Sequence, residues 1–297
     1  MNTEQPVIRL KPKTSPQRLR HGFPWVYDNE LVTDRRTRNI EAGSLVKLTD
    51  HAQNSLGLFA FNAHSKIIAR RVAFDPDTKI NTDWFIKKLT VALMFRNTLY
   101  DEPFYRLVHA EADNLPGLIV DRFDDILVVQ PNAAWADRLL LLLVDALKTV
   151  LAPKAIVING TGRARALEGL EDSRYVAHGE MPSKALRVPM NGAVYFADVA
   201  QGQKTGIFYD QRPNHNFVQN LTKNKSVLDV FSHVGGFGLA AMAAGAREVH
   251  CVDGSLPALE LAKLGAAATN AETAFTVQKA DAFDAMIGLQ EKEITYD

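Results

Sequence analysis

Short apolar runs separated by polar turns occupy the first part of the chain, a pattern typical of a small β-barrel. Three strands are predicted at residues 43–48, 56–61 and 67–72. A polar segment containing Pro76 follows, and Asp83 is a candidate N-cap for a helix over residues 84–99. That helix places Phe85, Leu89 and Phe95 among the residues of its apolar face.

The middle of the chain predicts an α+β layer. We expect four strands, at residues 105–109, 117–121, 126–130 and 155–159, with a long helix at 135–151 between the third and the fourth. Two further extended segments are expected at 175–178 and 187–196. Turns between neighbouring strands are short and rich in Asn, Asp, Pro and Gly. The pattern therefore favours an antiparallel sheet.

From residue 226 the pattern changes to alternating strands and helices. Strands are predicted at 227–231, 248–253 and 275–281, with helices at 237–244, 256–269 and 282–291. This alternation indicates parallel strands joined by right-handed crossovers, an α/β fold. Three parallel strands leave an open edge and an uncovered apolar face. We therefore expect the sequence to be a fragment of a longer protein, or a partner to supply the rest.

Composition excludes several classes of protein. Of 297 residues 46% are hydrophobic and 23% charged, which is ordinary for a soluble globular protein. The single Cys251 cannot form an internal disulfide, and the longest apolar run, residues 139–144, is far too short to span a membrane. Residues 1–13 lack the apolar core of a secretory signal, so a cytoplasmic location is expected.

The formal net charge is zero, but the charges are unevenly distributed. Residues 1–72 hold 12 Lys and Arg against 6 acids, whereas the remainder holds 22 against 28. A basic module on an acidic body suggests that one end binds a polyanion, although scattered surface charge is the simpler alternative. The candidate RNA-binding residues lie in this module: Arg18, Arg20, Trp25, Arg35, Arg36, Arg38, Arg70 and Arg71. Trp25 has the alternative of being a core residue.

Acidic residues follow each of the three C-terminal strands. Asp229 precedes a glycine turn at residues 235–238, and Asp253 and Asp281 end the next two strands. Ligands of parallel sheets bind outside the carboxyl ends of the strands, where a carboxylate accepts hydrogen bonds from ribose hydroxyls. The glycines would allow close approach of a ligand, or serve only strand–helix packing, and each acid has the alternative of capping a helix. Their spacing does not match the dinucleotide fingerprint, so an oxidoreductase is disfavoured.

A third cluster lies just before these strands. Residues 202–212 concentrate hydrogen-bond donors and a carboxylate in a glycine-flanked loop, as needed to hold a zwitterionic amino-acid group. The loop lacks the spacing of a phosphate-binding loop, which argues against a nucleoside triphosphate.

Together these motifs resemble a known family. Residues 203–206 with 210–212, followed by Phe231, Ser232 and the glycine turn, are similar to class I S-adenosylmethionine-dependent methyltransferases of bacterial large-subunit ribosomal RNA. The chain most resembles members with an N-terminal PUA domain that make 5-methylcytosine. Residues 21–26 resemble the opening of their PUA barrel, and residues 115–122 resemble their central α+β domain.

The resemblance implies three parts: a PUA-like barrel at 1–74, a central α+β domain at 84–196, and the first part of a Rossmann-like methyltransferase domain at 197–297. It implies S-adenosylmethionine as cofactor and ribosomal RNA as partner. Asp253 would bind the ribose of the cofactor and Asp281 its adenine, while the glycine turn and the loop at residues 203–212 would bind its methionine end. A homodimer is a further candidate partner arrangement. The implied cofactor residues are Gln203, Lys204, Thr205, Phe208, Asp210, Arg212, Asp229, Phe231, Ser232, Gly235, Gly236, Phe237, Asp253, Ser255, Asp281 and Ala282.

Two departures from the family pattern bear on activity. His233 and Val234 stand where the family usually has an aromatic residue and Thr. The family's Asp-Pro-Pro motif and nucleophilic Cys would lie beyond Asp297, so no catalytic residue is assigned here. Cytosine C5 needs a thiolate to add at C6, and Cys251, inside a predicted strand, is expected in the core. Methylation of a guanine nitrogen and a non-catalytic RNA-binding or assembly role therefore remain alternatives. The eight His residues show no metal-ligand spacing.

Overall fold

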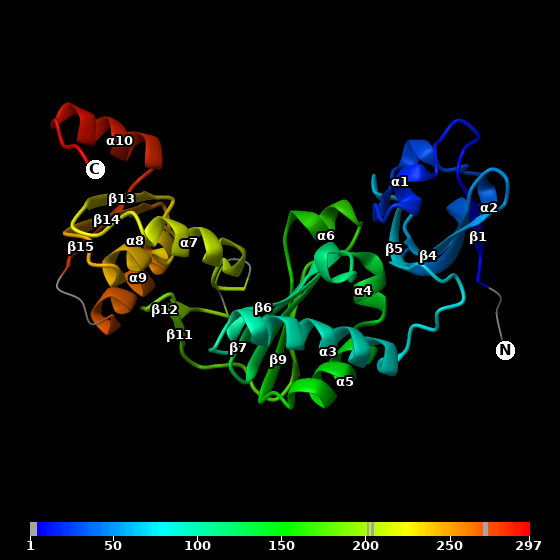
Figure 1. Ribbon diagram of the computed structural model, residues 1–297, viewed down its shortest axis with the longest axis horizontal. Coiled ribbons are helices and arrows are strands. Elements are labelled where there is room, and N and C mark those ends of the chain that lie inside the picture. Colours follow the sequence, from blue (N-terminus) through cyan, green and yellow to red (C-terminus); the bar gives the residue numbers. More distant parts are fainter. Residues whose placement is uncertain (1–4, 201, 203–204, 270–272) are drawn as a thin grey trace. The chain divides into compact units, whose positions relative to one another are not determined.

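The computed structural model describes residues 5–200, 202, 205–269 and 273–297 (Figure 1). It divides into two compact units. The first comprises Met1–Leu99 with Arg106–Glu180, and the second comprises Tyr100–Tyr105 with Met181–Asp297.

The first unit begins with a five-stranded sheet of order β1-β3-β4-β5-β2, where the sequence predicted the barrel, and we call it the barrel. Its elements are β1 (Val7–Arg9), α1 (Gln17–Arg20), β2 (Trp25–Val26), α2 (Arg35–Arg38), β3 (Ser44–Thr49), β4 (Ser55–Phe61) and β5 (Ala69–Ala73). β1 pairs parallel to β3, and the remaining neighbours are antiparallel. The three longer strands were predicted, but β1 and β2 were not.

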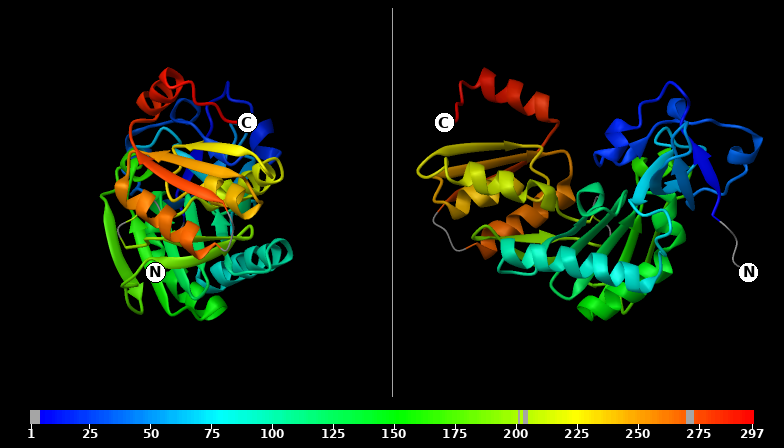
Figure 2. Two further views of the ribbon diagram at one scale, coloured as in Figure 1. Left: turned by 90° about the vertical axis from the view of Figure 1, so that its left-hand side faces the viewer. Right: turned by 45° about the vertical axis from the view of Figure 1, so that its right-hand side comes forward.

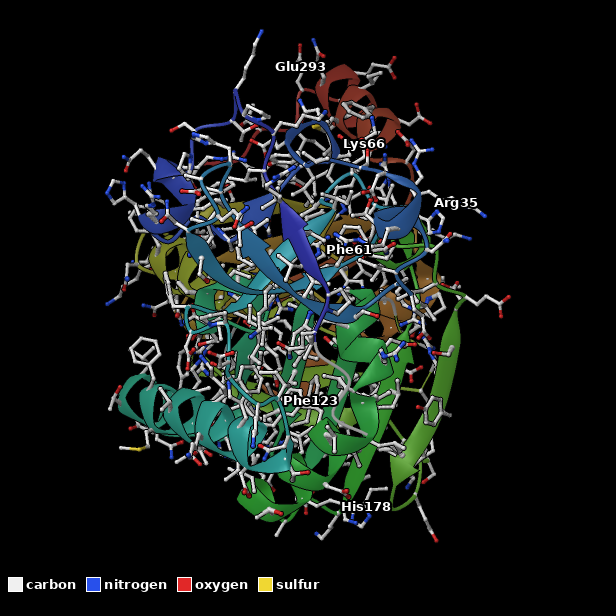
Figure 3. All side chains as sticks on the ribbon, turned by 90° about the vertical axis from the view of Figure 1, so that its right-hand side faces the viewer. Arg35, Phe61, Lys66, Phe123, His178 and Glu293 are labelled. Carbon is white, nitrogen blue, oxygen red and sulfur yellow. The ribbon has the colours of Figure 1, made fainter. Side chains whose placement is uncertain are left out.

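Inward-facing apolar side chains hold the barrel together. Phe59, Phe61 and Leu48 are fully buried in its core. Asp34 caps α2 by accepting a hydrogen bond from the Thr37 backbone at 2.8 Å. The basic side chains of this short helix are exposed. Figure 3 shows Arg35 at the outside of the barrel and Phe61 within it.

The second part of the first unit is a five-stranded sheet of order β10-β9-β8-β7-β6. Its strands are β6 (Phe104–His109), β7 (Leu118–Phe123), β8 (Ile126–Pro131), β9 (Ala155–Gly160) and β10 (Ser173–His178). Its helices are α3 (Thr82–Leu99), α4 (Ala134–Arg138), α5 (Leu140–Leu151) and α6 (Arg163–Leu167).

One expectation for this sheet was wrong. β8 and β9 pair parallel, whereas β7–β8 and β9–β10 are antiparallel. The reason is the connection: α4 and α5 carry the chain back along the sheet, so β9 starts at the same end as β8. The predicted single helix over 135–151 is also divided in two, at Leu139.

Glu168 joins the barrel to the central sheet within this unit. Its side chain is only 4% exposed and accepts hydrogen bonds from Ser65 (2.8 Å), Arg70 (2.9 Å) and Asn62 (3.1 Å). Burial alone would raise the pKa of Glu168, but the charge of Arg70 and these hydrogen bonds hold that pKa below its usual value. The barrel and the central sheet are therefore connected by the Glu168–Arg70 ion pair, in which the two charges neutralise each other.

The second unit holds the predicted parallel strands. β13 (Ser226–Val230), β14 (Glu248–Asp253) and β15 (Ala274–Lys279) pair parallel in that order, which confirms the α/β pattern. α8 (Gly236–Ala243) and α9 (Leu256–Ala268) lie on one face of the sheet, and α10 (Ala282–Glu291) lies on the other (Figure 2). α7 (Arg212–Gln219) packs against α8.

The hairpin of β11 (Leu186–Met190) and β12 (Ala193–Ala197) belongs to this second unit, which contains residues from Met181 onward. The sequence instead predicted that the central domain extends to residue 196. The Val194 backbone donates to Thr269 at 2.9 Å, and Tyr195 donates to the Gly236 carbonyl at 3.1 Å. The hairpin is thus bonded to the helices that cover the parallel sheet. Within the described part of the chain, no helix is long and apolar enough to cross a membrane.

Candidate cofactor site and nucleic-acid surface

Asp229 lies at the carboxyl end of β13 and is 6% exposed. Its Oδ2 accepts a hydrogen bond from the Gly238 backbone at 2.8 Å. Burial raises the pKa of Asp229 to about 6, against the lowering effect of backbone hydrogen bonds from Gly238 and Phe237. No Lys or Arg of the described residues forms an ion pair with this carboxylate. It is therefore suited to meet a cation brought by a ligand.

The glycine turn serves packing of the protein on itself. A Cβ at Gly238 would lie 2.5 Å from Cys251 Sγ, and one at Gly236 would lie 2.8 Å from His215 Nε2. Gly235 has φ of +80°, a conformation in which a side chain is strained. Of the two explanations offered for these glycines, strand–helix packing is the one that the contacts support. Cys251 is fully buried beneath Gly238, which confirms its expected place in the core.

Asp253 connects the turns after two neighbouring strands. Its Oδ2 accepts from the His233 backbone and its Oδ1 from the Ser255 backbone, each at 2.8 Å. Each carboxylate oxygen has a second lone pair, so both hydrogen bonds leave acceptor capacity for a ligand. Ser255, not Asp253, is the N-cap of α9, with its side chain accepting from the Ala258 backbone at 3.4 Å.

Asp281 is an N-cap. Its Oδ1 accepts hydrogen bonds from the backbones of Phe283 (2.9 Å) and Asp284 (3.3 Å) at the start of α10. Asp281 thus occupies an N-cap position itself, whereas Gly235 and Ser255 occupy those of α8 and α9. Asp229 nevertheless accepts from the Gly238 amide in the first turn of α8, so the capping alternative applies in part to Asp229 as well.

Two exposed aromatic rings lie at the same edge of the sheet. Phe231 is 68% exposed and Phe283 is 65% exposed, with their ring centroids 6.4 Å apart in an edge-on arrangement. Phe231 has φ of +59°, which non-glycine residues rarely adopt. The adjacent Ala282 is buried. These rings give the carboxyl edge an apolar surface of the kind a planar base can cover.

A cavity of about 210 Å³ lies between the loop before β13 and the turns after β13 and β14. Its lining includes Asp198, Gly206, His233, Val234 and Ser255. Phe208 contacts the His233 ring edge-on at 5.0 Å. The predicted loop and turn are thus brought together.

The other predicted loop residues differ in placement. Thr205 is buried and donates to the Ile207 carbonyl at 3.1 Å, while Asp210 is exposed. Gln203 and Lys204 lie outside the described residues. Arg212 is engaged away from the cavity: it donates to the Phe104 carbonyl at 2.8 Å and lies 4.1 Å from the Tyr100 ring centroid. These contacts give Arg212 a structural role that the sequence did not indicate.

Sequence reasoning missed a buried pair beneath the turn, Tyr195 and His215. His215 is 3% exposed, packs 4.5 Å from the Phe237 ring centroid, and has no hydrogen-bond partner at Nδ1. Burial lowers the pKa of His215 to about 4, so its ring is neutral at physiological pH. Neither residue belongs to a motif with recognisable spacing, so the sequence carried no signal for them. No group of His, Cys, Asp and Glu in the described ranges is arranged to hold a metal ion.

The candidate RNA-binding residues fall into two sets. Arg35, Arg36 and Arg38 are exposed on α2, and Arg20 is exposed while paired with Asp50 at 2.7 Å. Arg18 pairs with Glu30 and lies 4.6 Å from the Phe23 ring centroid.

The second set faces inward. Arg70 pairs with Glu168 at 2.9 Å and Glu111 at 3.4 Å, and Trp25 donates to Glu111 at 2.8 Å. Arg71 is 6% exposed. Arg70 and Trp25 therefore hold the two parts of the first unit together, whatever else they do.

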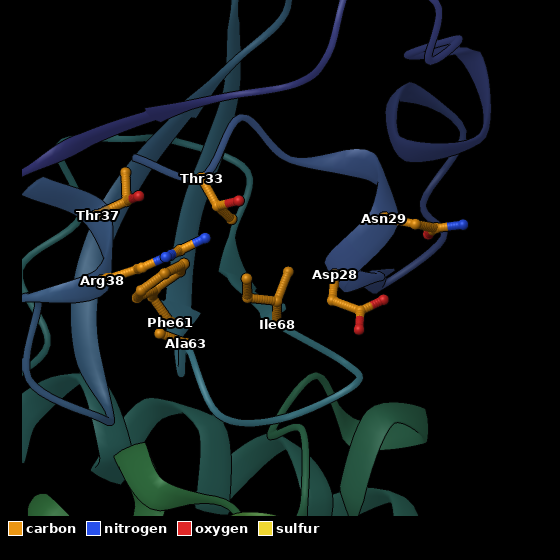
Figure 4. Close-up of a pocket in the computed structure, with 8 residues that line it drawn as sticks. All are labelled: Asp28, Asn29, Thr33, Thr37, Arg38, Phe61, Ala63 and Ile68. Carbon is orange, nitrogen blue, oxygen red and sulfur yellow. The ribbon is translucent and has the colours of Figure 1, made fainter. Parts of the chain in front are cut away.

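A second hollow lies beside α2 on the barrel, with a volume of about 330 Å³. Figure 4 shows Arg38 and Asp28 on opposite sides of it, with Thr33 at its rim and Phe61 and Ile68 at its base. An exposed arginine beside an open polar hollow is compatible with contact to a phosphate backbone.

Comparison with known proteins defines the class. Residues 8–74 match the family model of a PUA-like domain, and residues 162–264 match that of an S-adenosylmethionine-dependent methyltransferase. The chain thus carries a PUA-like domain and a segment of an S-adenosylmethionine-dependent methyltransferase domain.

Its curated relatives are more specific in name. The chain is 37% identical to ribosomal RNA large subunit methyltransferase I of Aliivibrio fischeri over 84% of this chain and 63% of that protein. It is 35% identical to the protein of the same name from Vibrio cholerae, over 88% of this chain and 66% of the relative. The chain thus spans slightly less than two thirds of the length of these relatives.

Solved structures share the fold. A Streptococcus mutans protein assigned as an S-adenosylmethionine-dependent methyltransferase superposes with a TM-score of 0.81 at 20% identity, covering 99% of this chain and 75% of that one. A second structure, of an assigned methyltransferase complexed with SAH, gives a TM-score of 0.81 at 19% identity, covering 99% of this chain and 74% of the other.

Proposed function

We propose that the second unit binds S-adenosylmethionine at the carboxyl edge of β13–β15, and that the protein uses it to methylate a base of large-subunit ribosomal RNA. The observation that carries the proposal is the pair of carboxylates at this edge. Asp229 is buried with no Lys or Arg of the described residues paired to it, and Asp253 keeps acceptor capacity on both oxygens. These two features match the ammonium and the ribose hydroxyls of that cofactor.

The residues present fit the group. A buried carboxylate without a cationic partner is costly, and a ligand ammonium at Asp229 would stabilise its ionised form. Asp253 would hold the ribose hydroxyls, and Phe231 and Phe283 would flank the adenine. We keep Asp281 as a candidate acceptor for the adenine amine, through lone pairs that its capping hydrogen bonds leave free. The rest of the cofactor would enter the cavity between the loop and the turns, which Phe208 and Ser255 would border.

When bound, this cofactor supplies an electrophilic methyl group. The chain's own residues hold its two ends and shield it, and the exposed arginines of α2 would contact the RNA backbone. The SAH complex of the structural neighbour and the names of the curated relatives support this proposal.

Cytosine C5 is our first choice of target atom, from the resemblance to 5-methylcytosine enzymes. That reaction requires a thiolate, and the buried Cys251 does not supply one: burial raises the pKa of its thiol well above the usual value. Methylation of a guanine nitrogen requires no thiol and is the alternative. We place the activity in the cytoplasm, with the ribosomal RNA as partner; a homodimer stays a prediction.

Titration calorimetry of the 297-residue chain with S-adenosylmethionine tests the cofactor proposal. We expect micromolar binding, and at least a tenfold loss in Asp253→Ala, because two backbone-held acceptors for the ribose disappear. Glu260→Gln, an exposed carboxylate on α9, is the matched control and should bind normally. Absence of binding to the wild-type chain, or binding of a nicotinamide cofactor instead, would reject the proposal.

A further inference from the structure

A cavity of about 450 Å³ in the first unit has no role in the site described above. It lies between β5 with the segment that follows it and the first turns of α3, and its walls include Arg71, Phe74, Trp84, Lys88 and Glu111. Its volume is within the range of small-ligand sites. We call it the Trp84 cavity.

Arg71 is the unusual member of this wall. It is 94% buried, being 6% exposed, yet its Nε and Nη1 have no hydrogen-bond partner. Its Nη2 donates to the Leu19 carbonyl, and no carboxylate of the described residues forms an ion pair with it. Buried cations are normally paired, because an uncompensated charge in the interior is costly. These two nitrogens are shielded from solvent, and the rings of Phe59 (5.3 Å) and Phe74 (4.4 Å) cover the guanidinium, so Arg71 contributes an unneutralised positive charge to this wall of the cavity.

Aromatic rings accompany both cations of the cavity. The Arg71 guanidinium lies 4.4 Å from the Phe74 ring centroid, and Phe74 is 63% exposed. The Lys88 ammonium lies 5.4 Å from the Trp84 ring centroid, and burial lowers the pKa of Lys88. A cation beside a flat ring is the arrangement that holds a phosphate and an unstacked base together.

The acids in the wall distinguish a nucleotide from a bare anion. Glu111 already accepts from Trp25 at 2.8 Å and from Arg70 at 3.4 Å, so its charge is offset. Asp75 is exposed and accepts from the Asp77 backbone at 2.9 Å. Acceptors of this kind suit the amino groups at a base edge, which a bare anion does not have.

We infer that the Trp84 cavity binds one unpaired nucleotide of the RNA substrate, its phosphate at Arg71 and Lys88 and its base against Phe74 or Trp84. This inference rests on the proposed RNA partner and adds a contact point to it. The site is distinct from the cofactor edge, whose residues all belong to the second unit.

The test measures binding of a fluorescently labelled single-stranded RNA 20-mer to the full chain by anisotropy, at several salt concentrations. Phe74→Ala and Lys88→Gln should each weaken binding by about threefold to tenfold, since base stacking and a phosphate contact are lost. Lys88→Gln should also reduce the salt slope by about one, whereas Phe74→Ala should leave it unchanged.

Matched controls lie on the same helix. Lys87→Gln removes the same charge one residue away, and Phe95→Ala removes an exposed ring; neither residue lines the cavity. Both controls should bind RNA as the wild type does. Denaturation followed by tryptophan fluorescence, which reports on the first unit, should show that all four variants fold like the wild type. All four should also retain wild-type affinity for S-adenosylmethionine, because the proposed cofactor site lies in the second unit.

The outcomes separate the two proposals. Cavity variants that bind RNA like their controls would overturn the inference and leave the proposed function standing. A wild-type chain that binds S-adenosylmethionine but no RNA would overturn the RNA partner and the inference with it. Adenosine monophosphate that binds the wild type but not Phe74→Ala, with RNA affinity unaffected by either cavity variant, would assign the cavity to a free nucleotide and also overturn the inference.

Discussion

The two units bury charge in opposite ways. In the first unit, buried acids are paired with arginines: Glu168 with Arg70 at 2.9 Å, and Asp121 with Arg106 at 2.9 Å. In the second, the buried Asp229 is held by backbone amides and pairs with no cation in the described ranges of the chain, and burial raises its pKa to about 6. A buried acid that is paired with an arginine stabilises the fold, whereas a buried acid that no cation neutralises can bind a cationic group of a ligand.

The largest expected effect concerns the neutralised acid. Glu168→Ala should destabilise the first unit by about 3–5 kcal/mol, because it strands the Arg70 charge and the donors of Asn62 and Ser65. The three tryptophans, at positions 25, 84 and 135, all lie in this unit, so denaturation followed by tryptophan fluorescence measures it alone. Glu171→Ala, an exposed neighbour, should change the free energy of unfolding by less than about 0.5 kcal/mol. Equal effects of the two variants would contradict the assigned role.

The second effect concerns His215, whose pKa in the folded protein is about 4, below the 6.5 of an ordinary histidine. His215 takes up a proton below about pH 6.5 in the unfolded chain but only near pH 4 in the folded chain. The neutral, buried His215 ring therefore contributes to stability above pH 6.5, and this contribution is lost as the pH falls from 6.5 to 4. The loss approaches about 3 kcal/mol at pH 4. Asp229, whose folded pKa is raised, acts in the opposite direction, so the comparison is with His215→Phe.

Hydrogen exchange of α8 peptides should show the wild type losing protection relative to His215→Phe as pH falls from 6.5 to 4, after correction for intrinsic exchange rates. Parallel pH profiles for the two proteins would show that the buried ring does not control the stability of this unit.

Asp229→Asn is expected to have an intermediate effect, on binding and not on stability. The amide keeps an acceptor for Gly238 but lacks the charge for a ligand ammonium, so affinity for S-adenosylmethionine should fall about 10–100-fold at pH 7.5. Wild-type affinity should also decline as pH falls through about 6, where Asp229 takes up a proton, while the affinity of the variant stays flat. Calorimetry at pH 5.5, 6.5 and 7.5 measures both; a wild-type profile as flat as that of the variant would contradict the role.

The smallest effect is expected at an exposed pair. Lys263 and Glu260 lie 2.8 Å apart on α9, one helical turn from each other and both exposed. Lys263→Gln should change stability by less than about 0.5 kcal/mol, because solvent screens such pairs. Urea denaturation followed by circular dichroism provides the measurement, and a loss above 1 kcal/mol would show that surface charge matters here as buried charge does.

Local periodicity predicted much of this fold. The bounds of β14 and α10 agree with the predicted 248–253 and 282–291, because apolar runs and caps are encoded within each segment. β1 and β2 escaped prediction since they are three and two residues long and exist only by pairing with distant strands. The parallel β8–β9 pair depends on the path of a connection, which periodicity does not record.

The candidate site was only partly readable. The positions of Asp229 and Asp253 at strand ends follow from the βα pattern, but the capping role of Asp281 depends on backbone geometry at the start of α10. Likewise, nothing local distinguishes Arg212, which packs on Tyr100, from an arginine that faces a ligand. Direction of a side chain is a tertiary property.

Phe231 carries a lesson for protein engineering. Its left-handed backbone and its ring, 68% exposed to solvent, are both unfavourable by the criteria of a stability-guided redesign, which would replace it with glycine or a polar residue early. Such a sequence would gain melting temperature while losing the aromatic surface beside the carboxylate edge. Thermostabilised versions of this chain should therefore be selected with the cofactor present, so that tolerance of heat and retention of the binding edge are optimised together.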